Sequence, residues 1–154
     1  MRKMLLGLTA MVLLTAAQAT TPPNLPQAAA SLDVRLVVPC QPGDQTYTLV
    51  GSNEELCLAK DKVFDGAAVV KVERYPTLPK VVMEISPTAA DRLFDATSSG
   101  TSEQRLGFVF NGRLIFAPFV GSPLKLKELP LTLKNDPDDI DALVAAFPAN
   151  VAEK

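Results

Sequence analysis

Hydrophobic and polar positions change their spacing along the chain, and the change marks where a strand gives way to a helix. From Lys80 to Ser86 apolar residues roughly alternate with polar ones and β-branched residues are frequent, which predicts a half-buried strand. Ser86 and Pro87 then supply an N-cap acceptor and a first helical residue that needs no N–H. The apolar residues that follow recur at helical spacing as far as Thr97, so we predict a helix over residues 87–98.

Residues 105–117 have the pattern of a β-hairpin whose turn is Asn111–Gly112. Both central residues of a type I′ turn have positive φ, which Asn tolerates and Gly adopts freely. A two-residue turn sets the pairs across the hairpin: Phe110 with Arg113, Val109 with Leu114, Phe108 with Ile115, and Gly107 with Phe116. Side chains alternate between faces, so Phe108 and Ile115 share one face, and the other carries Val109, Leu114 and Phe116. One apolar face packs on the helices; the other is either covered by the chain itself or open to a partner.

The remaining patterns complete an α+β fold. Alternation predicts strands at 32–38, 47–50, 55–59 and 67–75 and within 124–133, where Pro130 indicates an edge or a bulge. Residues 60–66 fit one helical turn. Asn135–Phe147 fits a second helix with Asp136 as N-cap and Pro137 at its first position. We therefore expect a mostly antiparallel sheet of about six to eight strands with the two helices packed on one side.

The N-terminus has the pattern of a secretory signal. Arg2 and Lys3 precede an apolar run, and Ala17-Gln18-Ala19 fits the small-x-small cleavage rule. The run is shorter than the ~20 residues that span a bilayer. We predict a signal peptide over 1–19 cleaved after Ala19, a flexible leader over 20–31, one domain over 32–148 and a periplasmic location. The formal net charge is −2 for the whole chain and becomes more negative on cleavage. A negative net charge gives no electrostatic reason to expect nucleic-acid binding.

The chain has two cysteines, Cys40 and Cys57. An exported chain with an even number of cysteines favours a disulfide. Redox pairs usually lie two residues apart with a lowered thiolate pKa, and this spacing is different. We predict one structural disulfide.

The composition excludes several kinds of chemistry. The sequence contains no His, which rules out Ser-His-Asp and Cys-His catalysis and His-ligated zinc. The eight glycines form no phosphate-binding loop, and the aspartates of 136–141 lack the ligand spacing of a calcium loop, so helix capping is expected of them. The catalytic groups that the composition still allows are a Ser–Lys pair or two carboxylates. We expect no enzyme activity, no cofactor and no metal site.

Taken in order, these segments resemble the head subdomain of the first periplasmic domain of SecD, a membrane component of bacterial protein export. The resemblance extends from about residue 32 to 147 and is carried mainly by three segments, VVMEISPTAADRLFDAT, LGFVFNGRLIFAP and DIDALVAAF. It implies the α+β fold, and it implies polypeptide or membrane-side partners.

The expected function is therefore binding. We predict an accessory protein that contacts exported polypeptide or an envelope protein, with candidate contact residues Val109, Leu114, Phe116 and Phe119. An inhibitor or immunity-type protein that blocks one toxin or enzyme is the alternative, because small exported domains with a disulfide suit that role equally well. A small hydrolase is a third.

Overall fold

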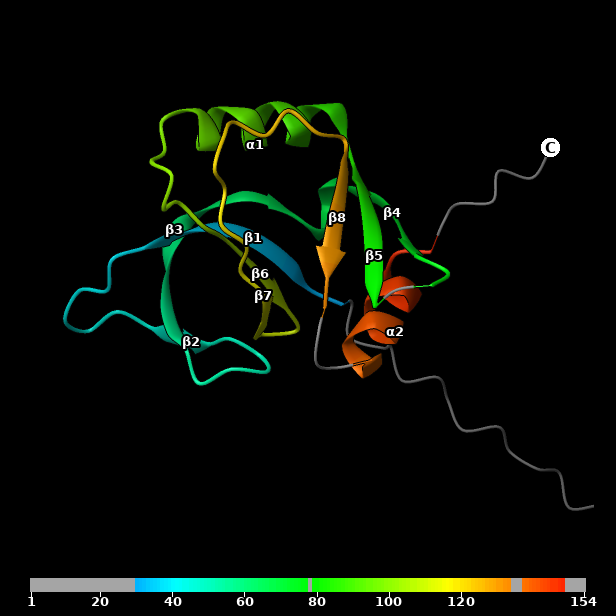
Figure 1. Ribbon diagram of the computed structural model, residues 1–154, viewed down its shortest axis with the longest axis horizontal. Coiled ribbons are helices and arrows are strands. Elements are labelled where there is room, and N and C mark those ends of the chain that lie inside the picture. Colours follow the sequence, from blue (N-terminus) through cyan, green and yellow to red (C-terminus); the bar gives the residue numbers. More distant parts are fainter. Residues whose placement is uncertain (1–29, 78, 134–136, 149–154) are drawn as a thin grey trace, which may run out of the picture.

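The computed structural model describes residues 30–77, 79–133 and 137–148, and these form eight strands, one short 3₁₀ helix and two α-helices (Figure 1). The α+β class is confirmed. The elements are β1 (Leu32–Val38), β2 (Thr46–Thr48), β3 (Glu55–Asp65), η1 (Gly66–Ala68), β4 (Val69–Arg74), β5 (Lys80–Ile85), α1 (Pro87–Ser98), β6 (Leu106–Phe110), β7 (Arg113–Phe116), β8 (Glu128–Thr132) and α2 (Pro137–Ala146).

The strands form two sheets, which corrects the expectation of one. The first sheet has the order β2-β3-β1-β6-β7 and the second the order β4-β5-β8, and all these pairs are antiparallel. The chain passes from the first sheet to the second at η1, where the Asp65 side chain accepts a hydrogen bond from the Ala67 N–H (3.0 Å). This cap lies in the turn between β3 and β4, which belong to different sheets.

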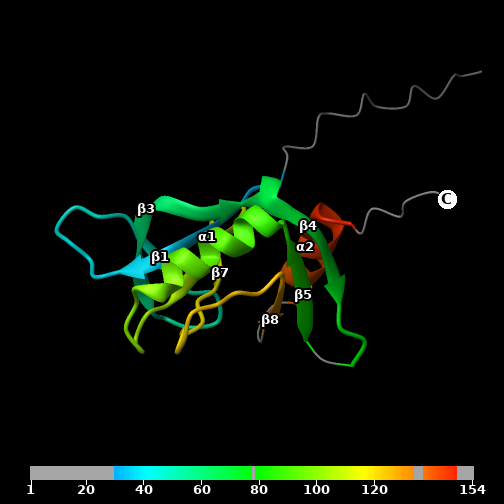
Figure 2. The same ribbon diagram turned by 90° about the horizontal axis from the view of Figure 1, so that it is seen from above.

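The two α-helices contact different sheets, so they do not share one side of a single sheet. Helix α1 contacts β3, whereas α2 contacts β4 and β5. Figure 2 shows them apart, with α2 beside the three-stranded sheet. Helix α1 begins as predicted, because Ser86 Oγ accepts a hydrogen bond from the Ala89 N–H (3.3 Å) and Pro87 follows. The predicted N-cap Asp136 lies outside the described residues. Apolar side chains of both sheets and both helices share one core, among them Val34, Met83, Leu93, Phe108 and Leu143.

The first sheet curls until its two ends meet. Beyond β2, Leu49 forms a parallel bridge with Leu114 of β7, and the Val50 N–H donates to the Leu114 carbonyl (2.9 Å). Because β2 and β7 are the outer strands of the five, this contact closes the sheet into a small barrel. The chain itself therefore covers the second face of the hairpin.

The hairpin register is as predicted next to the turn and shifts farther away from it. Phe110 pairs with Arg113 and Val109 with Leu114, but Phe108 pairs with Phe116, so Ile115 is an extra residue in β7. The predicted pairs of Phe108 with Ile115 and of Gly107 with Phe116 were wrong. A bulge of this kind increases the local twist, which suits a strand at the closing edge of a barrel.

Residues 60–66 are not a helical turn as expected, because β3 continues through Asp65. Pairing with β1 decides this: Lys62, Phe64 and Asp65 lie opposite Arg35, Val34 and Asp33. Val63 and Phe64 are buried as a result. The short helical segment forms immediately afterwards, at Gly66–Ala68.

Candidate functional site

The four predicted contact residues do not form one surface. Val109 and Leu114 fill the inside of the closed barrel and are 8% and 1% exposed. The bulge brings Phe116 to the ring of Phe108, with centroids 5.7 Å apart, so Phe116 does not share the face of Val109 and Leu114 as predicted. Phe119 is 67% exposed. Only Phe119 and the half-buried Phe116 are therefore within reach of a partner.

Phe119 lies on a cluster organised by Arg105. The Arg105 guanidinium is 4.6 Å from the centroid of the Phe119 ring, a cation–π contact. Its two terminal nitrogens donate to Glu54 Oε1 and Oε2 (2.5 and 3.2 Å), and its Nε donates to the Ala117 carbonyl (3.0 Å). The Arg105 side chain thus joins the loop before β3, through Glu54, to the end of the hairpin, and it also contacts the exposed ring of Phe119.

This cluster also sets the acid–base behaviour of Glu54. The hydrogen bonds from Arg105 lower the pKa of Glu54 below its ordinary value of 4.5, against a smaller opposing effect of desolvation. Sequence reasoning missed the pair, because 51 positions separate Glu54 from Arg105 and neither residue stands in a recognisable motif. The closure of the barrel brings them together.

An apolar groove of about 260 Å³ lies between the segment after β2, the end of β7 and β8. It is lined by Leu49, Val50, Gly51, Ser52, Ile115, Phe116, Ala117 and Thr132. Its size is close to the lower limit for small-molecule sites, ~300 Å³. A groove of this size and lining suits one or two apolar side chains of a partner.

Each edge of the three-stranded sheet has one feature that hinders strand addition. On β4 the Val72 N–H donates to the Phe147 carbonyl (2.8 Å). On β8, the backbone groups of Lys127 and Leu133 form hydrogen bonds toward β5. In an antiparallel pair only every second residue does so, and Pro130 is one of the residues in between. The backbone groups of Pro130 therefore point away from the sheet. Pro130 lacks an N–H there, and the prediction that it marks an edge is confirmed. A partner is therefore expected to contact side chains in preference to a strand edge.

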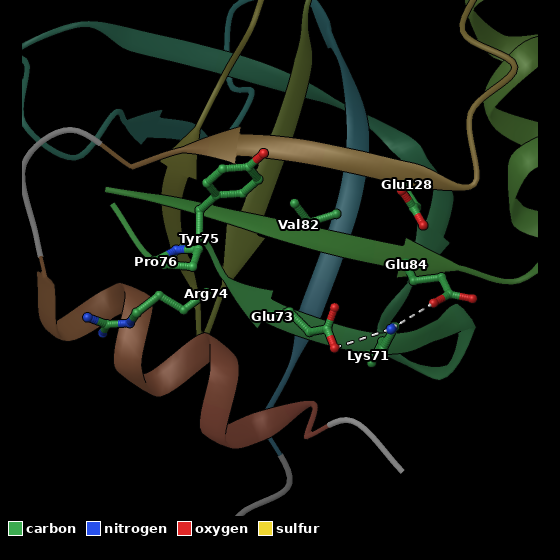
Figure 3. Close-up of a pocket in the computed structure, with 8 residues that line it drawn as sticks. All are labelled: Lys71, Glu73, Arg74, Tyr75, Pro76, Val82, Glu84 and Glu128. Atoms are coloured by element: carbon green, nitrogen blue, oxygen red, sulfur yellow. Dashed lines mark ion pairs between the residues drawn. The ribbon is translucent and has the colours of Figure 1, made fainter. Parts of the chain in front are cut away.

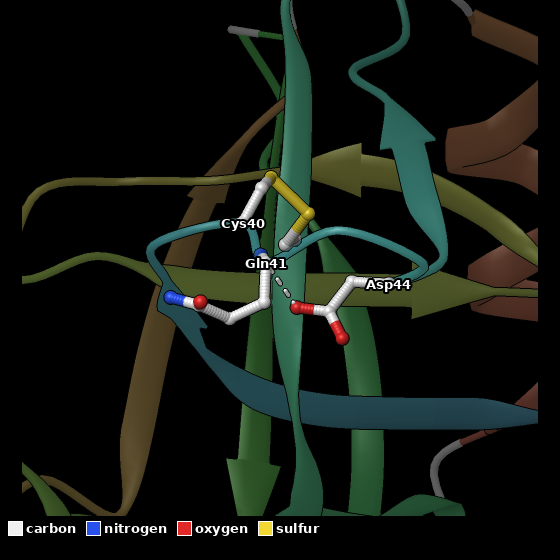
Figure 4. Close-up of a disulfide and its surroundings, with 4 residues drawn as sticks. Cys40, Gln41 and Asp44 are labelled. Atoms are coloured by element: carbon white, nitrogen blue, oxygen red, sulfur yellow. Dashed lines mark hydrogen bonds between the residues drawn. A yellow bond between two sulfur atoms is a disulfide. The ribbon is translucent and has the colours of Figure 1, made fainter.

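The predicted disulfide between Cys40 and Cys57 is present and anchors an exposed loop (Figure 4). Cys57 is buried in β3, and every residue from 39 to 46 is exposed. Within the loop, the Gln41 N–H donates to Asp44 Oδ2 (2.8 Å) and the Asp44 N–H donates to the Gln41 carbonyl (3.0 Å). The loop is therefore held in one shape both at its base and in its middle.

Among residues 30–77, 79–133 and 137–148, no three His, Cys, Asp or Glu side chains come together as metal ligands would. Two of the aspartates near the start of α2 have basic partners: Asp139 pairs with Arg113 (2.8 Å), and Asp141 pairs with Arg74. In the same part of the chain, neither α-helix has the length and apolar character needed to cross a bilayer. The absence of enzyme activity stays a prediction.

Comparisons with known proteins find similarity at the level of the fold. Neither protein-family models nor curated protein sequences give a match. Among solved structures, one described as "Structure and function of a membrane component SecDF that enhances protein export" matches with a TM-score of 0.59 and 19% identity, over 80% of this chain and 69% of that one. A second, "Crystal structure of SecDF in Super-membrane-facing form", matches with a TM-score of 0.55 and 17% identity, over 77% of this chain and 18% of that one. The chain thus has a fold similar to part of SecDF.

Proposed function

We propose that this protein is an exported, non-enzymatic accessory module that binds polypeptide, built like the head subdomain of the first periplasmic domain of SecD. The observation that carries the proposal is the similarity in fold to SecDF, which is described as enhancing protein export. The signal pattern at residues 1–19 supports a periplasmic location. The match covers 18% of the second SecDF structure, and the proposal is limited to contact with polypeptide.

The apolar groove is the proposed contact surface. Its lining comes mainly from Leu49, Val50, Ile115, Phe116 and Ala117, so burying an apolar side chain of a partner there would be favourable. Such a contact does not depend on the partner's sequence in detail, which suits weak binding of many unfolded chains. The groove includes one of the predicted contact residues, Phe116.

Binding of a fluorescent, reduced and carboxymethylated protein, which stays unfolded, tests the proposal by anisotropy. Val50→Glu places a charge in the groove and is expected to weaken binding about tenfold, because the carboxylate would lose water on contact with an apolar partner. Val70→Glu is the matched control, since Val70 is 44% exposed on β4 and does not line the groove. Circular dichroism checks that both variants fold. No binding by the unchanged protein, or equal loss in both variants, would contradict the proposal.

The anchored loop at 39–45 favours a second candidate, an inhibitor or immunity-type protein with one specific target. A loop already fixed by a disulfide and by the Gln41–Asp44 hydrogen bonds loses little conformational entropy on binding, which favours tight association. Affinity purification from envelope extract followed by calorimetry separates the two functions. One partner bound with nanomolar affinity, lost when Gln41 and Asp44 are changed together to Ala, indicates inhibition; weak binding of many chains indicates polypeptide capture.

A further inference from the structure

The outward face of the three-stranded sheet has no covering element among the described residues and is hollowed to about 280 Å³ (Figure 3). Burial alternates along β5, where Val81, Met83 and Ile85 are buried while Val82 and Glu84 are partly exposed on the other face. Strand β4 adds Lys71 and Glu73, and β8 adds Glu128. This open face, defined by the pocket residues of Figure 3, is a surface distinct from the apolar groove.

The charges on this face are unbalanced, because one of its two cations, Arg74, pairs with Asp141 of α2. Lys71 Nζ lies 3.2 Å from Glu73 Oε1 and 3.5 Å from Glu84 Oε2, so a single ammonium group serves two carboxylates. The hydrogen bond with Glu73 is the main reason that the pKa of Lys71 is raised. Glu128 lies directly opposite Glu84 on the neighbouring strand and forms no ion pair with any residue that the structure describes. The end of the face around Glu84 and Glu128 therefore has excess negative charge.

The pairing of Glu84 with Glu128 does not serve stability. Like charges directly opposite each other on adjacent strands are unfavourable, whereas opposite charges there are favourable. Solubility does not explain the pair either, because like charges and opposite charges at these two positions would both keep the surface polar. An added positive group between these two carboxylates would relieve their repulsion and gain two charge-assisted contacts.

The other end of the face is apolar and aromatic. Tyr75 is 49% exposed, and in Figure 3 its ring extends over the sheet on the side toward Val82. Val82 and Glu84 are two positions apart on one strand, so their side chains stand about 6–7 Å apart on the same face. An extended peptide has the same spacing between side chains that point the same way. The face thus offers an apolar and an acidic contact at the repeat of an extended chain.

We propose that this face binds an extended polypeptide segment in which a lysine or arginine stands two positions from an apolar residue. The cationic group lies between Glu84 and Glu128, and the apolar side chain packs on Val82 and Tyr75. The charge of the face excludes an anionic lipid surface as the occupant, because acidic headgroups would be repelled. The proposal does not depend on binding in the apolar groove, so either can fail without the other.

Anisotropy of two labelled synthetic peptides tests this proposal with the purified protein. One peptide alternates lysine with leucine separated by serine, and the other has glutamate in place of each lysine. The lysine peptide is expected to bind at low salt and the glutamate peptide not to bind. Changing Glu84 and Glu128 together to Gln should weaken binding of the lysine peptide about fivefold or more, as the loss of exposed charge contacts predicts.

The sharpest control is Lys71→Gln, because it removes the cation that competes for Glu84. It should tighten binding of the lysine peptide, an effect opposite in sign to that of the double variant. Glu103→Gln, an exposed carboxylate in the loop after α1, controls for net charge and should leave the affinity unchanged. Equal binding of both peptides, no loss in the double variant, or weaker binding with Lys71→Gln would each overturn the proposal. Retained binding of the unfolded protein by the Glu84/Glu128 double variant would show that the apolar groove acts independently.

Discussion

At the scale of single residues, Gly107 lies where an added side chain would press on two leucines inside the barrel. A Cβ at this position would lie 2.6 Å from Leu58 Cδ2 and 3.2 Å from Leu114 Cδ1. A side chain at this position of β6 would therefore force Leu58 and Leu114 to move. Periodicity alone could not reveal this, because Leu58 belongs to a distant strand.

We predict that Gly107→Ala lowers the free energy of unfolding by about 1–2 kcal/mol, because the added methyl overpacks the barrel. Urea denaturation measures the change. Gly121→Ala is the matched control, since a Cβ there meets no atom within 4 Å, and it should change stability by no more than ~0.5 kcal/mol. Equal stability of the two variants would show that Leu58 moves aside without cost.

Glu54 gives a pH prediction at the same scale. Its pKa in the folded protein is below the ordinary 4.5, so ionised Glu54 stabilises the fold above that value, and the contribution is lost as the pH falls through the lowered pKa. Wild type should therefore unfold at a higher temperature than Glu54→Gln at neutral pH, and the difference should vanish in acid. Thermal unfolding followed by circular dichroism from neutral pH downward tests this. A difference that grows toward acid would contradict the ion pair with Arg105.

At the scale of elements, the ion pair of Arg113 with Asp139 joins the hairpin to α2. Arg113 follows the Asn111–Gly112 turn, and its Nη1 donates to Oδ1 of Asp139 in the first turn of α2 (2.8 Å). Asp139 is 7% exposed, and a carboxylate in the first turn also interacts favourably with the helix dipole. The turn and the helix were each predictable from local sequence, but their contact was not.

Asp139→Asn should lower the free energy of unfolding by about 1–2 kcal/mol, because the amide keeps the shape but loses the charge-assisted bond and the dipole interaction. Guanidinium denaturation gives the value. Asp91→Asn, an exposed aspartate on α1, is the control and should have little effect. If both variants are as stable as wild type, the Arg113 contact contributes nothing measurable.

Local signals explain which elements could be predicted. Ser86-Pro87 sets the start of α1, Asn111-Gly112 sets the turn with φ of 49° and 80°, and both act within a few residues. The segment 60–66 shows the opposite case, because its charged sequence suits a helical turn but the structure pairs it with β1. The bulge at Ile115 likewise depends on barrel closure, which no local signal encodes.

At the scale of the whole molecule, the disulfide connects the segment just after β1 to β3 across a separation of 17 residues. Cys57 is 1% exposed and pairs in register with both Val38 and Thr46, so the bond lies where three strands of the barrel meet. It restricts the unfolded chain and fixes the base of the exposed loop.

Changing Cys40 to Ser and Cys57 to Ala together should lower the free energy of unfolding by about 3 kcal/mol, the chain-entropy value for a loop of this length. Alanine suits position 57, because a buried serine hydroxyl would add a separate cost. Wild type treated with dithiothreitol should unfold at the same urea concentration as the double variant. Unchanged stability on reduction would mean that the barrel contacts alone hold the loop.

The sequence by itself determined what neighbouring residues control: the two proline-started helices, the Asn–Gly turn, the paired cysteines and the α+β class. Tertiary structure decided whatever joins residues far apart in the chain: the division into two sheets, closure of the first by Leu49 and Leu114, burial of Val109 and Leu114, and the Arg105–Glu54 pair. The physical reason is that caps and turns are satisfied by local hydrogen bonds, whereas a barrel closes only when strands distant in sequence gain backbone bonds and burial together. The open acidic face and the apolar groove are consequences of that assembly.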